Sequence, residues 1–329
     1  MKRIVTSTIF TLTILALYQF VDLNLFTIDF PRRVRCKLFK SLRNYPWIDP
    51  GIVIVDIEYT HLDTVKTKLE QLQSLGPKFI GVNLCNIKDT SSLLDNYLKQ
   101  SKKIITCNCN TNSDKGTSRI TTSKNEVTHF LTDKDSYFEL QLTDKLNELK
   151  ERRNGKERIH FREENMYYQF YLSELEYILP EIVKDKTVIV GFLYDSLVTP
   201  MNEWYGRPGY TEGDMSDAQI SANIVSTINR NEFINEVSPF VRISIILIVS
   251  LLLSGLLRLL RTRRDTLNII LGVIFFIILN VLSTALIVLA FDKNYYLNLD
   301  EMTVVLLISA IVSVYWNTRD NKATQTVHN

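Results

Sequence analysis

The stretch GIVIVDI at residues 51–57 is the clearest indication of fold in this sequence of 329 residues. Apolar, mainly β-branched residues run through it almost without interruption, which is typical of a strand buried on both faces of a parallel sheet. Apolar residues then recur at helical spacing over residues 63–75, and Gly76-Pro77 ends that helix. A second strand is predicted at residues 78–84. This order of elements predicts an α/β fold with right-handed crossovers.

The sequence that follows continues the alternation of helices and strands. Residues 108–124 are rich in Asn, Thr, Ser and Lys, which predicts an exposed loop or a small hairpin. Ser216 is placed to cap the last helix of the domain. The further predicted elements are a helix at 91–101, strands at 103–107 and 126–131, a helix at 138–152, a short strand at 158–161, a helix at 172–183 interrupted by Pro180, a strand at 187–193 and a helix at 216–230.

Four strongly apolar runs occupy residues 4–20, 243–257, 267–291 and 302–316. A membrane-spanning helix needs about 20 mostly apolar residues, which the third run supplies by itself and the others reach with their flanks. We therefore predict one N-terminal and three C-terminal membrane helices. No small-x-small motif follows the first run, which favours an uncleaved anchor over the alternative of a cleaved signal peptide.

Lys and Arg residues predict the orientation of these helices. Lys2 and Arg3 precede the first run, four Arg residues lie at 258–264, and Arg319 and Lys322 follow the last run. Both termini are therefore expected to be cytoplasmic. The predicted divisions are an anchor at 1–21, an extracytoplasmic α/β domain with a mainly parallel sheet and flanking helices at 22–239, a three-helix membrane bundle at 240–317 and a cytoplasmic tail at 318–329.

Composition and motifs narrow the class of function. A net charge of +2 argues against a nucleic-acid-binding protein, and 46% hydrophobic residues argue against disorder. The sequence contains no HExxH, GxSxG, P-loop or GxGxxG motif, so we expect a protein that is not an enzyme. The four His residues are scattered, and no cofactor or metal is predicted.

Ligands of open α/β sheets bind beyond the carboxyl ends of the strands. The side chain of Asp56 lies at the end of an apolar strand, where it either faces a ligand or caps a helix or anchors a loop. The loop at 203–214 is either a ligand lid or partner surface, or a structural turn beside the membrane. The candidate ligand-binding residues are Asp56, Glu58, Asn83, Asp195, Thr199 and Arg207.

The four cysteines are Cys36, Cys85, Cys107 and Cys109. Disulfides form outside the cytoplasm, and Cys85 and Cys107 follow neighbouring predicted strands. A disulfide between these two residues and free thiols are the two readings that remain open.

Four motifs follow one another along the chain: IVIVDIE at 52–58, KFIGVNL at 78–84, DKTVIVGFLYDSLVTP at 185–200 and ISANIVSTI at 220–228. In sequence and order they resemble motifs of the CHASE2 extracellular sensory domain of bacterial signalling receptors. The family also has one membrane helix before the extracytoplasmic domain and three after it. The chain departs from the family pattern at Asn83, where Asp is usual, and at Gln219 and Ser221, where Glu and His are typical.

The resemblance implies a sensory or ligand-binding protein anchored in the bacterial inner membrane. Receptors of this kind usually continue into a cyclase or kinase, whereas the cytoplasmic parts predicted here are too short to fold as a catalytic domain. We therefore expect a stand-alone form that signals through a separate partner chain. The alternative is a structural or assembly subunit of a multiprotein envelope complex. Expected partners are membrane lipid, a small ligand, effector or complex subunits and further copies of the chain, but not nucleic acid.

Overall fold

A computed structural model of the protein describes most of the chain beyond residue 47. The described residues divide into two compact units, with the boundary between Ile234 and Asn235. The residues that the structure describes are 48–58, 60–83, 92–101, 103–107, 117–121, 127–152, 154–162, 166–193, 196–197, 215–260, 262, 264–297 and 300–328.

The first unit is built on a five-stranded sheet in which all paired strands are parallel, with the spatial order β3–β2–β8–β1–β7. This confirms the predicted α/β class and its mainly parallel sheet. The sheet's last strand in sequence, β8, lies between β2 and β1. The strands are β1 (Ile52–Asp56), β2 (Phe79–Val82), β3 (Ile104–Thr106), β7 (Tyr168–Tyr171) and β8 (Thr187–Gly191).

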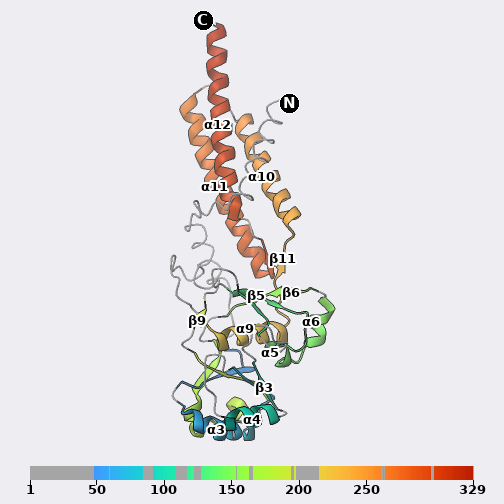
Figure 1. Ribbon diagram of the computed structural model, residues 1–329. Coiled ribbons are helices and arrows are strands. Elements are labelled where there is room, and N and C mark those ends of the chain that lie inside the picture. The colour runs from blue at the N-terminus through green and yellow to red at the C-terminus, as the bar shows by residue number, and fades with distance from the viewer. Residues whose placement is uncertain are drawn as a thin grey trace. The chain divides into compact units, whose positions relative to one another are not determined.

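Helices cover both faces of this sheet (Figure 1). One face packs against α3 (Leu62–Ser74), α4 (Ser92–Gln100), the 3₁₀ helix η3 (Leu172–Tyr177) and α7 (Pro180–Val183). The other face packs against α5 (Phe138–Gln141) and α9 (Asp217–Asn229). The apolar strands are therefore enclosed on both sides, which is why they read as continuous hydrophobic runs.

A second, smaller sheet covers the outer side of α9. It is antiparallel and contains β4 (Arg119–Thr121), β5 (Val127–Leu131) and β6 (Lys156–Arg158), so a hairpin does follow the Asn-rich segment. Apolar residues of β5 and of α9 share one cluster, whereas Ala222 and Val225 of α9 pack against the main sheet. Because α9 lies between two sheets, its residues from Ala218 to Ile228 are all buried.

Three predictions for this unit need correction. The helix predicted at 138–152 is two helices, α5 and α6 (Leu146–Arg152), because the chain turns at Leu142 to place its side chain over Gly81. The first half of the helix predicted at 172–183 is a 3₁₀ helix, and Pro180 starts α7 instead of interrupting it. Strand β6 begins earlier than predicted, and edge strand β7 was not predicted at all.

A two-stranded ribbon leads into α9. It pairs β9 (Ser196–Leu197), which follows the carboxyl end of β8, with β10 (Met215–Ser216). Ser216 is the N-cap residue, as predicted: its side chain accepts a hydrogen bond from Gln219 N, while the Gln219 side chain accepts one from Ser216 N. This capping box fixes where α9 begins.

The second unit contains three long helices, α10 (Pro239–Leu259), α11 (Asp265–Asp292) and α12 (Asp300–His328). Helix α12 packs against both others (Figure 1). Gly272 permits close approach of α11 to α12, since a Cβ there would lie 2.7 Å from Val314 Cγ2. Short strands β11 (Asn235–Glu236) and β12 (Tyr295–Tyr296) pair in parallel beside the helices.

Among the described residues, two helices are long and apolar enough to cross a membrane by length and composition, at Pro239–Leu259 and Asp265–Ala290. The apolar part of α12, Val305–Arg319, is shorter. Helix α12 also continues through most of the segment predicted as a tail. The predicted N-terminal anchor at 1–21 lies outside the described residues.

Candidate functional site

Four strand positions form a line across the carboxyl edge of the main sheet, and we call them the edge row: Asp56, Gly191, Asn83 and Cys107. Asp56 of β1 is paired with Gly191 of β8. Asn83 N donates to Val190 O at 2.8 Å, and Cys107 N donates to Val82 O at 2.9 Å. The sheet therefore places two residues 27 positions apart, Asp56 and Asn83, on either side of Gly191.

The side chains of the edge row are on the α9 face of the sheet. Side chains alternate between faces along a strand. Ile52 and Ile54 belong to the cluster that includes α9, so Asp56 follows on the same face. Cys107 belongs to that cluster too, and a Cβ on Gly191 would lie 3.8 Å from Asn83 Cβ. The edge row therefore lies on the face of the sheet that α5 and α9 cover.

Helix α9 begins directly above Gly191. A Cβ added to this glycine would lie 3.3 Å from the Cβ of Ala218 and 3.4 Å from Asn83 O, closer than most side chains tolerate. Glycine on the strand and alanine on the helix together allow the first turn of α9 to approach the sheet. Any larger side chain at residue 191 has to displace α9 or the end of β2.

Asp56 is a buried carboxylate, only 3% exposed. Burial raises its pKa, opposed by a hydrogen bond in which Glu58 N donates to Asp56 Oδ1 at 3.0 Å. Asp56 thus anchors the following loop, the structural role that the sequence left open. Backbone hydrogen bonds from Leu193 and Ile57 also lower the pKa of Asp56, while the charge of Glu58 adds to its rise.

Of the other ligand-binding residues predicted from the sequence, some lie at the carboxyl edge of the sheet and some lie outside the described residues. Asn83 is 4% exposed and lies in the edge row, while the side chain of Glu58 is exposed at the same end of the sheet. Asp195, Thr199 and Arg207 lie outside the described residues, as does the whole 203–214 loop. Cys36, Cys85 and Cys109 are outside them too, so the disulfide between Cys85 and Cys107 stays a prediction.

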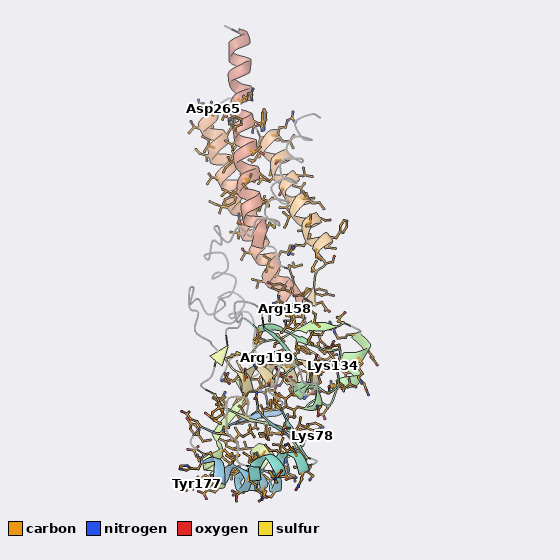
Figure 2. The ribbon with its side chains drawn as sticks, viewed as in Figure 1. Lys78, Arg119, Lys134, Arg158, Tyr177 and Asp265 are labelled. Atoms are coloured by element: carbon orange, nitrogen blue, oxygen red, sulfur yellow. The ribbon has the colours of Figure 1, made fainter. Side chains whose placement is uncertain are left out.

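Charged groups surround the other end of the edge row. Arg119, labelled in Figure 2, forms an ion pair with Asp217 in the first turn of α9. Burial raises the pKa of Cys107 to about 12, with a further contribution from the negative charge of Glu139. A thiol with this pKa stays protonated at neutral pH and behaves as a small apolar side chain.

Glu139 connects three segments from a completely buried position. Its Oε2 accepts hydrogen bonds from Ser118 N at 2.7 Å and from Ser118 Oγ at 2.9 Å, and its Oε1 accepts one from Ser221 Oγ at 3.0 Å. The carboxylate therefore joins α5 and the start of β4 to the middle of α9. Its three donors offset the cost of burying the group.

The C-terminal end of α9 is held by a second polar cluster, which we call the C-terminal clamp: Asp49, Arg162, Ser226, Arg230 and Glu232. Ser226 Oγ donates to Asp49 Oδ2 at 2.6 Å, and Arg230 Nε donates to the same oxygen at 2.8 Å. Arg162 Nε donates to Ser226 Oγ at 3.1 Å, and its guanidinium forms an ion pair with Glu232.

Arg162 is the most deeply buried charged group of this clamp, with a side chain that is 1% exposed. Charged residues are almost never buried without partners, so its guanidinium requires a compensating charge. Burial alone would raise the pKa of Glu232, but a hydrogen bond from His160 and the charge of Arg162 hold that pKa down to about 2. His160 Nδ1 lies 2.9 Å from Glu232 Oε2. Glu232 is therefore ionised at neutral pH and compensates the buried guanidinium.

Sequence reasoning missed the clamp. Its residues come from before β1, from the segment after β6 and from the end of α9, and of these only Ser226 lies in one of the motifs, ISANIVSTI at 220–228. The one available indication was the polar side of the predicted helix at 216–230, where Asn223, Ser226 and Thr227 interrupt an otherwise apolar pattern. Polar residues inside a helix that is buried all round require partners.

Within the described part of the chain, no three His, Cys, Asp or Glu side chains are grouped so as to hold a metal ion. The edge row instead offers a carboxylate, an amide and the start of a helix, which suit hydrogen bonding to a small polar molecule. The described part of the chain thus combines an α/β unit that carries this edge with two helices long and apolar enough to cross a membrane.

A model of the CHASE2 domain family matches residues 5–257, which is most of the chain. The protein therefore belongs to the CHASE2 domain family, a family of sensory domains. The matched region takes in the whole α/β unit and nearly all of α10. The chain matches no curated protein and no solved structure.

Proposed function

We propose that this protein is a membrane-anchored extracytoplasmic sensor that binds a small ligand at the edge row and signals through a separate partner chain. The observation that carries the proposal is the course of α9. The helix begins above Gly191 in the edge row and ends at Asn229, shortly before Asn235, where the unit of long apolar helices begins. Along the chain, a single helix therefore connects the candidate ligand site to the short segment that precedes the long apolar helices.

Helix α9 is suited to transmit a displacement as a unit. Its 13 residues span about 20 Å at 1.5 Å per residue. It is enclosed between two sheets, and its polar side chains are bonded to Glu139 and to the C-terminal clamp. Packed cores switch between discrete arrangements more readily than they deform. A displacement of the first turn of α9 would therefore also displace its last turn.

The segment that follows α9 is hydrogen-bonded on both sides of the unit boundary. Ile234 forms a bridge with Arg158 of the small sheet. Asn235 N then donates to Asn294 O at 2.7 Å, and Val237 N donates to Tyr296 O at 3.3 Å. A change that reaches Asn235 would thus act on α10 through the chain and on the turn between α11 and α12 through these bonds.

The proposal includes the membrane topology expected from the sequence. Residues 22–239 would be extracytoplasmic, and four spans in the bacterial inner membrane would leave both termini in the cytoplasm, in agreement with the Arg residues at 258–264. The protein would bind a ligand without catalysing a reaction. An effector chain, membrane lipid and further copies of the protein are the partners in this scheme.

The test is to move α9 without a ligand. Gly191→Val places a branched side chain against Ala218, so we expect about 1–3 kcal/mol of overpacking strain at the start of α9. In the full chain in lipid nanodiscs, hydrogen–deuterium exchange at the amides of Asn235 and Val237 should become about tenfold faster, the factor that corresponds to about 1.4 kcal/mol.

Gly155→Val is the matched control, because a Cβ on Gly155 would meet no atom within 4 Å. This variant should leave the exchange of Asn235 and Val237 unchanged. If Gly191→Val accelerates exchange in β8 and α9 but not at these two amides, α9 does not transmit, and the sensory proposal fails.

A second candidate function, an assembly subunit of an envelope complex, is favoured by one observation. Large apolar or aromatic side chains are exposed at the end of η3 and just before α7: Tyr177, labelled in Figure 2, is 79% exposed and Leu179 is 65% exposed. Tyr168 and Tyr171 on edge strand β7 are exposed as well. Exposed apolar residues that come from neighbouring elements are typical of interaction surfaces.

The two functions are separated by a surface variant. Tyr177→Glu with Leu179→Glu should disrupt a complex purified from native membranes if the protein is an assembly subunit. The sensory proposal instead expects the complex to survive this change, because the edge row and α9 contain neither residue.

A further inference from the structure

The side chain of Gln219 is buried at the start of α9 with one half of its amide bonded. The residue is 2% exposed. Its Oε1 accepts a hydrogen bond from Ser216 N at 2.8 Å, whereas its Nε2 has no acceptor among the residues that the structure describes. Buried amide donors are nearly always bonded, so this one calls for an acceptor.

The position of the amide defines where that acceptor would be. Because Oε1 is held by the N-cap residue, Nε2 lies at the N-terminus of α9. The first backbone N–H groups of a helix have no partner within it, and the helix dipole makes this end partly positive. Gln219 Nε2 and the helix terminus together suit an oxygen acceptor.

The charges around the edge row disfavour a simple anion in this place. Asp56 is a buried carboxylate on the α9 face, and Glu139 and Asp217 both act on Cys107 at the other end of the row. Arg119 supplies a positive charge, but Asp217 already neutralises it. Among the described residues, carboxylates exceed cations here, so a ligand gains by offering a hydrogen-bond donor or a positive charge to Asp56.

We propose that the edge row and the first turn of α9 bind a small polar molecule with a carbonyl or carboxylate oxygen and an amino or hydroxyl donor, the chemistry of free amino acids and sugars. The oxygen accepts from Gln219 Nε2, and the donor binds Asp56. Gly191 allows the first turn of α9 to come close to Asp56, the neighbour of Gly191 in the sheet. This inference rests on the proposed sensory function and names the chemistry of its ligand.

The chain offers a matched pair of variants for the test. Gln219→Glu keeps an oxygen that can accept from Ser216 N, so the capping box remains, but it removes the Nε2 donor. Ser216→Ala does the reverse: it removes the hydroxyl of the N-cap residue and leaves the Gln219 amide in place. Asp56→Asn removes the negative charge at the other side of the site.

The full chain in lipid nanodiscs is assayed by thermal shift and native mass spectrometry against the twenty amino acids, glucose, glucosamine, acetate and inorganic phosphate. We expect an amino acid or a sugar to bind, and its affinity to fall at least about tenfold in Gln219→Glu and Asp56→Asn. Ser216→Ala should bind it as the unaltered chain does. The compounds of the panel that bind show whether the ligand is an amino acid or a sugar.

Three results would overturn the inference: binding of acetate or phosphate alone, equal affinity in Gln219→Glu, or no binding by any member of the panel. None of these bears on the Gly191→Val exchange experiment, which uses no ligand. Transmission that persists without panel binding therefore rejects the ligand chemistry and keeps the sensory function. Panel binding without transmission rejects the sensory function only.

Discussion

The two ends of α9 differ in how well their buried polar groups are compensated by partners. At the C-terminal end, Arg162 and Glu232 neutralise one another and Arg230 binds Asp49. At the N-terminal end, Gln219 Nε2 has no acceptor in the described part of the chain, and Asp56 is buried with a raised pKa. The clamp compensates its buried charges, whereas Gln219 Nε2 and the Asp56 carboxylate are buried without full compensation among the described residues, which costs stability.

The largest expected effect comes from breaking the clamp. Glu232→Ala leaves the guanidinium of Arg162 buried without its compensating charge, so we expect a loss of about 3 kcal/mol in the free energy of unfolding. Hydrogen–deuterium exchange at β8 in the full chain measures it. The double variant Arg162→Met with Glu232→Gln should recover most of the loss. A double variant as unstable as the single one would contradict the charge-based explanation.

Acidification should affect the stability of the two ends of α9 differently. The folded-state pKa of Glu232 is about 2, below its ordinary value of 4.5, and that of Asp49 is lowered as well. Their contribution to stability is present above their ordinary pKa values and is lost as the pH falls toward the folded-state values. The pKa of Asp56 is raised, so protonation of Asp56 favours the folded state.

Between pH 5 and about 2, the protection of backbone amides against hydrogen exchange should therefore fall first at residues 226–232 and later at the end of β1, around Asp56. Pulse-labelling across this range, with each rate compared with the intrinsic rate at the same pH, tests the order. Simultaneous loss of protection at both places would show that the ends of α9 are not electrostatically distinct.

A smaller effect is expected from the N-cap. Ser216→Ala removes the hydroxyl that accepts from Gln219 N, which costs about 1 kcal/mol. Gln219→Glu keeps the acceptor for Ser216 N but buries a carboxylate, so it should cost more than Ser216→Ala at pH 7 and approach that variant at acid pH, where the carboxylate is protonated. Thermal unfolding of the full chain at pH 7 and pH 4 compares the two variants. A large loss that does not change with pH would mean that the amide Nε2 has a structural partner.

The smallest effect is expected from Asp56→Asn. Asparagine keeps an oxygen that can accept from Glu58 N and removes the cost of burying a charge, so stability at pH 7 should change by less than about 1 kcal/mol, or rise. Exchange at β1 measures this difference. A loss as large as that of Glu232→Ala would identify Asp56 as a structural residue and remove it from the ligand site.

Local pattern was sufficient for several features of the fold and of the site. The apolar run at 51–57, the Gly76-Pro77 stop and the Ser216 cap predicted β1, the end of α3 and the start of α9, because each depends on residues close in sequence. Asp56 and Asn83 were placed at the carboxyl edge for the same reason. Leu142 was misassigned to a helix because the hydrogen bonds of its backbone matter less than the space that Gly81 leaves for its side chain.

The sequence by itself determined the α/β class, the apolar helices and the two polar residues at the strand ends, since periodicity and hydrophobicity are local properties. Only the tertiary structure decided that β8 separates β1 from β2 and so places Gly191 between Asp56 and Asn83. It also decided that Arg162 and Asp49 meet the end of α9. Such contacts join residues far apart in the chain, and their partners are chosen by packing and charge compensation, which no short stretch of sequence contains.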